Sequence, residues 1–197
     1  PEAAAVAQFL LSHPNITGVH AYHSHSGVIL RPSGYRRDVE LPPEDVELHQ
    51  IIGEVGSELT GYPVISTFED FTESLRSPRH GTLTDWTYEQ LGLVSFCPEF
   101  WDVETEAGAH KPQFFPHRTQ REEEEIALLR WVDEHASDGY VDWSPFDHPQ
   151  FGAIDLGGWD PFLVQRNPPP QFLELVARPT CRFSLHHAAA SPLVRIT

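Results

Sequence analysis

Val19-His20-Ala21-Tyr22-His23-Ser24-His25-Ser26-Gly27-Val28-Ile29-Leu30-Arg31-Pro32 is the stretch around which this 197-residue chain is organised. Apolar residues precede a His-x-His pair, and Gly27 opens a second apolar run. This pattern predicts a buried strand ending at the histidines, and α/β sheets place their chemistry at the carboxyl ends of strands. Imidazole is the commonest zinc ligand, so the pair indicates a metal site. Because His23 and His25 are two residues apart, both can bind one ion only if the backbone bends, and we expect one of them to be the ligand.

The composition indicates a globular protein and excludes some classes of partner. Hydrophobic residues make up 40% of the chain and charged residues 21%. The net charge of -16 argues against nucleic-acid binding, which needs a basic face. No apolar run approaches 18 residues, so we expect no membrane partner. Two cysteines are too few for a disulfide framework, and whether they pair stays open.

The start of the sequence does not indicate a cellular compartment. The chain opens at Pro1 without an initiator methionine or a signal peptide, and we expect it to be a piece of a longer protein. The localisation is therefore unknown.

Hydrophobic periodicity predicts helices that alternate with short strands. Helices are expected at 1–12, 42–60, 85–91 with Thr84 as the cap, after a capping-box pattern at 119–122, and at 172–177. Strands are expected at 62–65, 93–97 and 154–156, a loop at 138–149 and a turn at 157–160. The tail at 188–196 has the pattern of a first strand and predicts the start of a further β domain.

Glu99 follows the apolar run at 93–97 and is the carboxylate to single out on chemistry alone. A carboxylate at the end of a buried strand costs free energy unless it is paired or has a function. The alternative is a carboxylate at the rim of the sheet that accepts hydrogen bonds from a neighbouring loop.

Four motifs occur in an order that resembles a known family. They are His23-Ser24-His25-Ser26, Thr60-Gly61-Tyr62, Asp85-Trp86-Thr87-Tyr88 and a strand ending in Pro98-Glu99. Together they resemble the second half of the catalytic domain of the zinc carboxypeptidases of peptidase family M14. The likeness covers about residues 1–165 and implies an incomplete α/β domain with a mixed β-sheet flanked by helices. Residues 166–197 would then form a linker and the start of the β domain.

The resemblance also implies a role for each matching residue. His23 is similar to the family's third zinc ligand, and Glu99 to the general base that takes a proton from the zinc-bound water and passes it to the leaving amine. Ser24 would present its backbone to a peptide substrate, and His25 occupies the place of a Tyr that lines the active site. Thr84 falls where the family tunes its side-chain pocket, and a small polar residue there indicates neither a strongly apolar nor a basic preference.

The sequence departs from the family pattern in three ways. The first two zinc ligands of the family come from an HxxE motif, which this sequence lacks. The arginines that hold the substrate's terminal carboxylate normally lie upstream of the third ligand. A mobile Tyr ahead of the Asp-Trp motif has no counterpart here, and the aligned loop 77–80 has Arg76 and Arg79 nearby. The resemblance therefore implies that the N-terminal half of the domain lies outside these residues and is the partner of this chain.

Other functions compete with a zinc carboxypeptidase. A non-catalytic member of the same fold would bind peptide or a partner, and an upstream HxxE motif would decide between the two. An amidohydrolase-type barrel with His23 and His25 as metal ligands needs about 250 residues, more than this chain has. Cys97 could be a nucleophile, but the sequence places no His and Asn or Asp beside it, and a buried strand thiol is the favoured interpretation.

Overall fold

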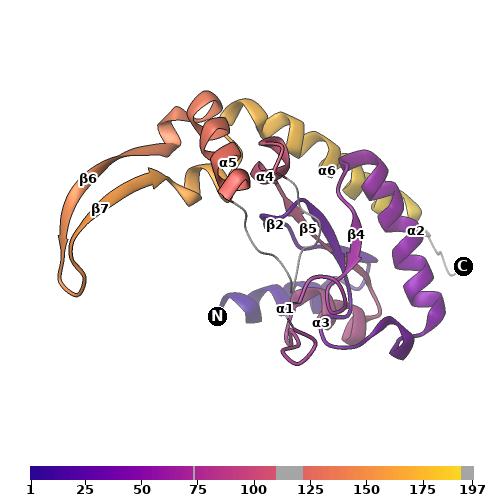
Figure 1. Cartoon of the computed structure of the whole chain (residues 1–197). Helices are drawn as coiled ribbons and strands as arrows, with labels where there is room; N and C mark the ends of the chain where they lie inside the picture. Colours follow the sequence, from indigo (N-terminus) through magenta and orange to yellow (C-terminus); the bar gives the residue numbers. More distant parts are fainter. Residues whose placement is uncertain (73, 110–121, 192–197) are drawn as a thin grey trace, which may run out of the picture.

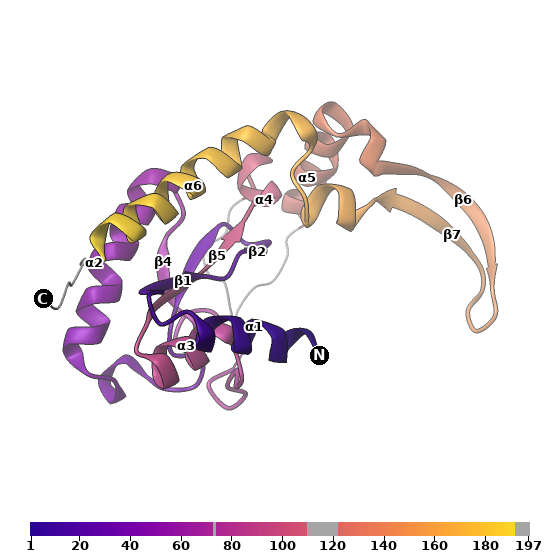
Figure 2. The same cartoon turned by 180° about the vertical axis from the view of Figure 1, so that it is seen from behind.

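The structure is a computed structural model that describes residues 1–72, 74–109 and 122–191. Its centre is a mixed β-sheet with the strand order β1-β5-β3-β4, in which β2 also pairs with β5. Strand β5 runs parallel to β1 and β2 and antiparallel to β3, and β3 runs parallel to β4. Helices flank this sheet (Figures 1 and 2). The predicted α/β class with a mixed sheet is confirmed.

The elements are mostly short. The strands of the main sheet are β1 (Gly18–His20), β2 (His23–Ser24), β3 (Val28–Arg31), β4 (Val64–Ser66) and β5 (Val94–Phe100). The α-helices are α1 (Glu2–Ser12), α2 (Pro43–Thr60), α3 (Leu83–Leu91), α4 (Val103–Glu106), α5 (Glu122–His135) and α6 (Leu173–Ala190). A separate hairpin is formed by β6 (Tyr140–His148) and β7 (Gly152–Trp159). Within the described ranges, no helix combines the length and the apolar character needed to cross a membrane.

Strand β5 crosses the core, and its alternate residues face opposite sides of the sheet. Phe96 packs into an apolar cluster supplied by β3, α2 and α6, whereas Cys97 packs into a cluster supplied by β3 and Phe71. A Cβ atom at Gly56 of α2 would lie 2.8 Å from the ring of Phe183 of α6. The missing side chain at Gly56 therefore lets the two helices approach closely on the Phe96 side.

The first half of the chain follows the predicted elements closely. The helices expected at 1–12, 42–60 and 85–91 are α1, α2 and α3, and the strand expected at 62–65 is β4. Strand β5 extends beyond the expected 93–97, so that Glu99 lies inside the strand and not after it. Of the capping-box pattern at 119–122, residues 119–121 lie outside the described residues, and α5 begins at Glu122.

The hairpin corrects two expectations. Residues 138–149, expected to be a loop, contain β6, and most of the turn expected at 157–160 belongs to β7. The hairpin extends as an arm from the body of the molecule (Figure 1). Most residues on both faces of the hairpin are exposed. Because neither face is buried, the sequence lacks the alternation of polar and apolar residues that predicts a half-buried strand.

Helix α6 also corrects the sequence prediction. The short helix expected at 172–177 continues to Ala190, so Ala188–Ala190 do not form the expected strand, and residues 192–197 lie outside the described residues. Pro179 is typical of a helix end, yet it lies inside α6. Contacts with α2 along the sheet override this local preference. The domain division at residue 165 stays a prediction.

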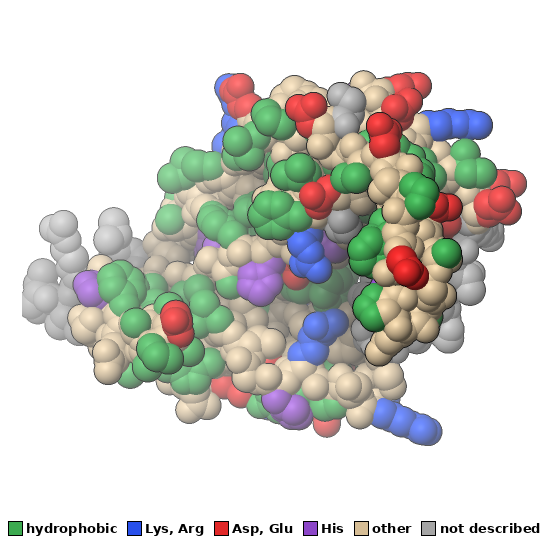
Figure 3. All heavy atoms as spheres, turned by 90° about the vertical axis from the view of Figure 1, so that its left-hand side faces the viewer, with side chains coloured by type: hydrophobic (Ala, Val, Ile, Leu, Met, Phe, Trp, Pro, Cys, Tyr) green, Lys and Arg blue, Asp and Glu red, His purple; other side chains and the backbone are tan. Residues whose placement is uncertain are grey.

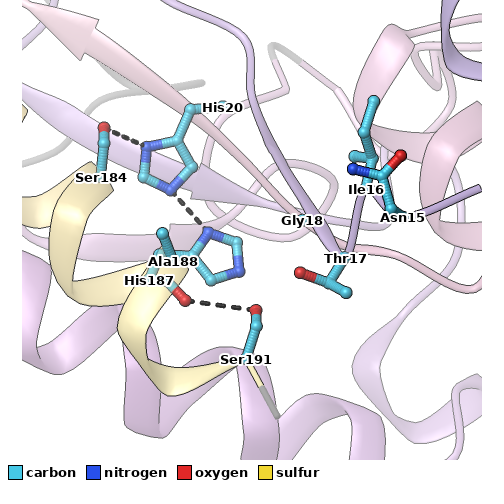
Figure 4. Close-up of a pocket in the computed structure, with 9 residues that line it drawn as sticks. All are labelled: Asn15, Ile16, Thr17, Gly18, His20, Ser184, His187, Ala188 and Ser191. Carbon is cyan, nitrogen blue, oxygen red and sulfur yellow. Dashed lines mark hydrogen bonds between the residues drawn. The ribbon is translucent and has the colours of Figure 1, made fainter. Parts of the chain in front are cut away.

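The buried His187 of α6 and the half-buried His20 of β1 form a pair beside a cavity of about 290 Å³ (Figure 4). Nδ1 of His187 lies 2.9 Å from Nε2 of His20, and Nδ1 of His20 lies 2.9 Å from Oγ of Ser184. Burial lowers the pKa of His20 to about 3 and that of His187 to about 4, so both rings are neutral near pH 7. A Cβ atom at Gly18 would lie 2.5 Å from the His187 ring, so the close approach of this ring requires a residue without a side chain at position 18.

Candidate metal centre and substrate cavity

The parallel register of β2 and β5 places His23 opposite Glu99. Nδ1 of His23 lies 3.7 Å from Oε1 of Glu99. The His23 side chain is 61% exposed and the Glu99 side chain 11% exposed. The imidazole can therefore meet an ion or a further protein segment from outside, while the carboxylate beneath it is shielded from water.

Cys97 completes a cluster with these two residues. It lies two residues before Glu99 on β5, so both side chains point to the same side of the sheet. Donor atoms of His23, Cys97 and Glu99 lie within 4.8 Å of one another, and no other such group of three occurs in residues 1–72, 74–109 and 122–191. Nitrogen, sulfur and carboxylate oxygen are all zinc ligands, so this donor set fits the ion by type.

The two buried groups of the cluster differ in what they can do near pH 7. Burial raises the pKa of Glu99 to about 7, and the nearby charges of Arg79 and Arg166 oppose that rise. Burial, followed by the charge of Glu99, raises the pKa of the Cys97 thiol to about 12. Cys97 is therefore a neutral thiol packed in the core, while Glu99 can exchange a proton.

A cavity of about 180 Å³ opens next to the cluster. It is bounded by β3 and β5 on one side and by the start of α3 on the other. Figure 3 shows a face of the molecule on which cationic, histidine and acidic side chains gather at a hollow. The residues that line the cavity with the cluster are Ala21, Leu30, Thr67, Phe71, Arg79, Thr82, Leu83 and Thr84.

The start of α3 forms one wall of the cavity and corrects the predicted cap. The helix begins at Leu83, and its N-cap is Thr82, whose Oγ1 accepts a hydrogen bond from the backbone N–H of Asp85 at 3.1 Å. Thr82 has the extended backbone of an N-cap, whereas Thr84 is already helical. Thr84 instead lies buried in the cavity wall, with its hydroxyl oxygen 3.2 Å from that of Thr82.

The loop that carries Arg79 is held against α3 through Gly34. The backbone N–H of Gly34 donates to both carboxylate oxygens of Asp85, at 2.9 and 3.1 Å. The backbone N–H of Arg79 donates to the carbonyl oxygen of Gly34 at 2.8 Å. A Cβ atom at Gly34 would lie 2.5 Å from the carbonyl oxygen of Arg79, so this contact needs glycine.

Ser24 and His25 lie away from this cavity. Ser24 and His23 line a second cavity of about 550 Å³, together with Arg166. His25 is half-buried beyond the end of β2 and is not part of the three-residue cluster. Of the two histidines in the motif, the structure brings His23 and not His25 next to Glu99.

Sequence reasoning missed the positions of two arginines. The sequence showed Arg79 only as a cation in the loop that aligns with the family's mobile Tyr. No sequence pattern indicated that it lies near Glu99. Arg166 follows the hairpin and belongs to no motif. Both act on the pKa of Glu99 only because tertiary structure brings them near.

Comparison with known proteins gives a family match and two similar proteins. The family model described as zinc carboxypeptidase, peptidase family M14, matches residues 1–130. Pig (Sus scrofa) carboxypeptidase A1 is 31% identical over 103 residues, which are 52% of this chain and 24% of that protein. The crystal structure of thrombin activatable fibrinolysis inhibitor aligns at 29% identity and a TM-score of 0.43, over 52% of this chain and 25% of that chain. The matched part therefore spans about a quarter of these relatives.

Proposed function

Because this chain belongs to the zinc carboxypeptidases of peptidase family M14, we propose that it forms part of a zinc-dependent catalytic centre. This centre hydrolyses the C-terminal peptide bond of peptide substrates. One observation carries the proposal: the register of β2 and β5 sets the His23 imidazole 3.7 Å from the shielded Glu99 carboxylate. This pair lies beside a cavity that also has Thr84 in its wall.

In this proposal His23 is a zinc ligand and Glu99 is the general base. Zinc, when bound, polarises the scissile carbonyl and makes water easier to deprotonate. Glu99 takes the proton of the attacking water and passes it to the leaving amine, which a shielded carboxylate facing the ligand is placed to do. Cys97 lies beside this pair and is given no catalytic role in the proposal.

The other assigned residues contact the substrate. Ser24 presents its backbone to the peptide, and His25 takes the place of a Tyr that lines the active site. Thr84, in the wall of the smaller cavity, contacts the side chain of the residue to be released.

The remaining zinc ligands come from outside these 197 residues. The sequence holds no HxxE motif, and catalytic zinc sites use three protein ligands. We place the missing ligands in the N-terminal half of the domain, which docks against this chain to complete the centre.

The test uses the full-length protein, with zinc content and release of the C-terminal residue measured on the same preparation. Glu99→Gln is expected to keep zinc and to lose turnover by at least about a hundredfold. His23→Ala is expected to lose zinc. Glu58→Gln and His13→Ala change the same residue types at exposed positions of the structure and serve as matched controls.

Each outcome has a distinct meaning. Turnover that survives Glu99→Gln removes Glu99 as the base, and full zinc content in His23→Ala removes His23 as a ligand. A full-length protein that binds peptide but releases no amino acid would instead be the non-catalytic binding member of the fold.

A further inference from the structure

We infer that Arg79 makes the cavity beside Glu99 a pocket for an acidic side chain, so that the preferred substrates end in a residue with a side-chain carboxylate. This inference rests on the proposed function for the orientation of the peptide. It adds the chemical class of the residue released.

The size of the cavity fits one side chain. Its volume is about 180 Å³, below the roughly 300–1,000 Å³ typical of sites for larger ligands. It adjoins the His23–Glu99 pair on one side and ends against α3 on the other. A residue whose peptide bond lies at Glu99 therefore extends its side chain toward α3.

Arg79 supplies the one cationic side chain among the cavity-lining groups of the described structure. Its guanidinium carbon lies 5.3 Å from the centre of the Phe71 ring, another part of the wall. This cation–π contact holds the guanidinium against the wall of the cavity. The hydrogen bond from its backbone N–H to Gly34 fixes the loop from which the side chain extends.

The guanidinium has no ion pair within 4.0 Å among residues 1–72, 74–109 and 122–191. Glu99 is near enough to be influenced by its charge but makes no such pair with it. The donors of Arg79 are thus available to a ligand. An arginine fork matches a carboxylate in shape and charge better than it matches an amide or an alkyl group.

The other polar groups of the wall suit the same ligand. The hydroxyl groups of Thr82 and Thr84 lie within 3.2 Å of each other, and each can rotate to donate to a carboxylate oxygen. A lysine or arginine side chain would meet Arg79 with like charge, so basic C-terminal residues are excluded.

The experiment compares two peptides that differ only in a C-terminal Glu or Gln, which have nearly the same shape and differ in charge. With the zinc-loaded full-length protein, we expect kcat/KM to favour the Glu peptide by about 10- to 100-fold. Arg79→Gln should remove most of this preference, and Arg79→Glu should shift it toward a peptide ending in Lys. Arg76→Gln removes an exposed arginine from the same loop, outside the cavity, and should leave the preference unchanged.

A second measurement separates this inference from the proposed function. Calorimetric binding of free L-glutamate and L-glutamine needs no turnover, and we expect tighter binding of glutamate that Arg79→Gln abolishes. If the protein binds glutamate more tightly than glutamine but hydrolyses neither peptide, the proposed function is wrong and the inference of a pocket for an acidic side chain still holds. Equal handling of Glu and Gln by the unmodified protein, or a preference that survives Arg79→Gln, would overturn the inference.

Discussion

His23 and Glu99 face each other across β2 and β5, with Nδ1 of the imidazole 3.7 Å from Oε1 of the carboxylate. This relationship is a property of strand register. A shift of one residue in β5 would turn Glu99 to the opposite side of the sheet and replace it by a neighbour of the wrong chemistry. The packing of Phe96 and Cys97 on opposite sides opposes such a shift, so core packing holds the candidate site in place.

The two cysteines should differ in reactivity. Cys97 is buried with its pKa raised to about 12, whereas Cys181 is exposed. Because the thiolate is the reactive form, a thiol reagent at pH 8 should label one cysteine per native chain. Mass spectrometry after labelling measures the count, and Cys181→Ala should reduce it to zero. Rapid labelling of Cys97 in the native protein would revive the nucleophile interpretation.

Removing the cap of α3 should weaken the cavity wall. Thr82→Ala deletes the oxygen that accepts from the N–H of Asp85, and loss of an N-cap costs about 1 kcal/mol of unfolding free energy. Urea denaturation measures the change. Thr82→Ser keeps the oxygen and should stay close to the unmodified protein. If Thr82→Ala were as stable as Thr82→Ser, Thr82 would not be the cap.

Gly18 should tolerate a side chain only when His187 is absent. The Cβ atom of Gly18→Ala would lie 2.5 Å from the imidazole, and such overpacking costs about 1–3 kcal/mol. In a His187→Ala background the same change should cost almost nothing. A double-mutant cycle from thermal or urea unfolding tests this coupling. If the free-energy costs of Gly18→Ala and His187→Ala were additive, the His187 ring and a side chain at position 18 would not compete for the same space.

The His20–His187 pair predicts a loss of stability in mild acid. The unfolded state binds a proton on each ring near pH 6.5, whereas the folded state resists protonation until about pH 4 at His187 and about pH 3 at His20. The stability that the two neutral rings contribute is thus complete above pH 6.5. As the pH falls below that value, the free energy of unfolding decreases by at most about 1.4 kcal/mol per pH unit for each ring. His49 and His186 also act on His187, and their charges lower its pKa further.

Urea unfolding between pH 7 and 4.5 measures this slope. His187→Gln should make the slope shallower, and His13→Gln, at an exposed position on the opposite end of the sequence, should not change it. An unchanged slope in His187→Gln would mean that other groups carry the acid sensitivity.

Elements with strong local signals could be predicted from the sequence. Helix α2 begins at Pro43 and ends before Gly61, which adopts the left-handed backbone that favours glycine. Helix α3 ends in the same way before Gly92. The apolar run of β5 also identified the central strand, and the motif order identified the family.

What could not be predicted depends on contacts distant in sequence. Helix α6 continues through Pro179 because it packs along α2, and β6 has no buried face to impose a period of two. The approach of Arg79 to Glu99 follows from the hydrogen bond to Gly34, a residue 45 positions earlier. The roles of His23, Ser24, His25, Thr84 and Glu99 stay predictions to be tested.

The base of the β6–β7 arm has a consequence for how this protein can vary in length. Tyr140 pairs with Trp159, and the N–H of Asp160 donates to the carbonyl oxygen of Gly139 at 2.6 Å, so the chain leaves the body and returns at nearly one point. Such a closed base lets residues be added to or deleted from the tip without displacing α5 or α6. The arm is thus a place where evolution can lengthen, shorten or exchange a segment while the sheet that carries His23 and Glu99 is left untouched.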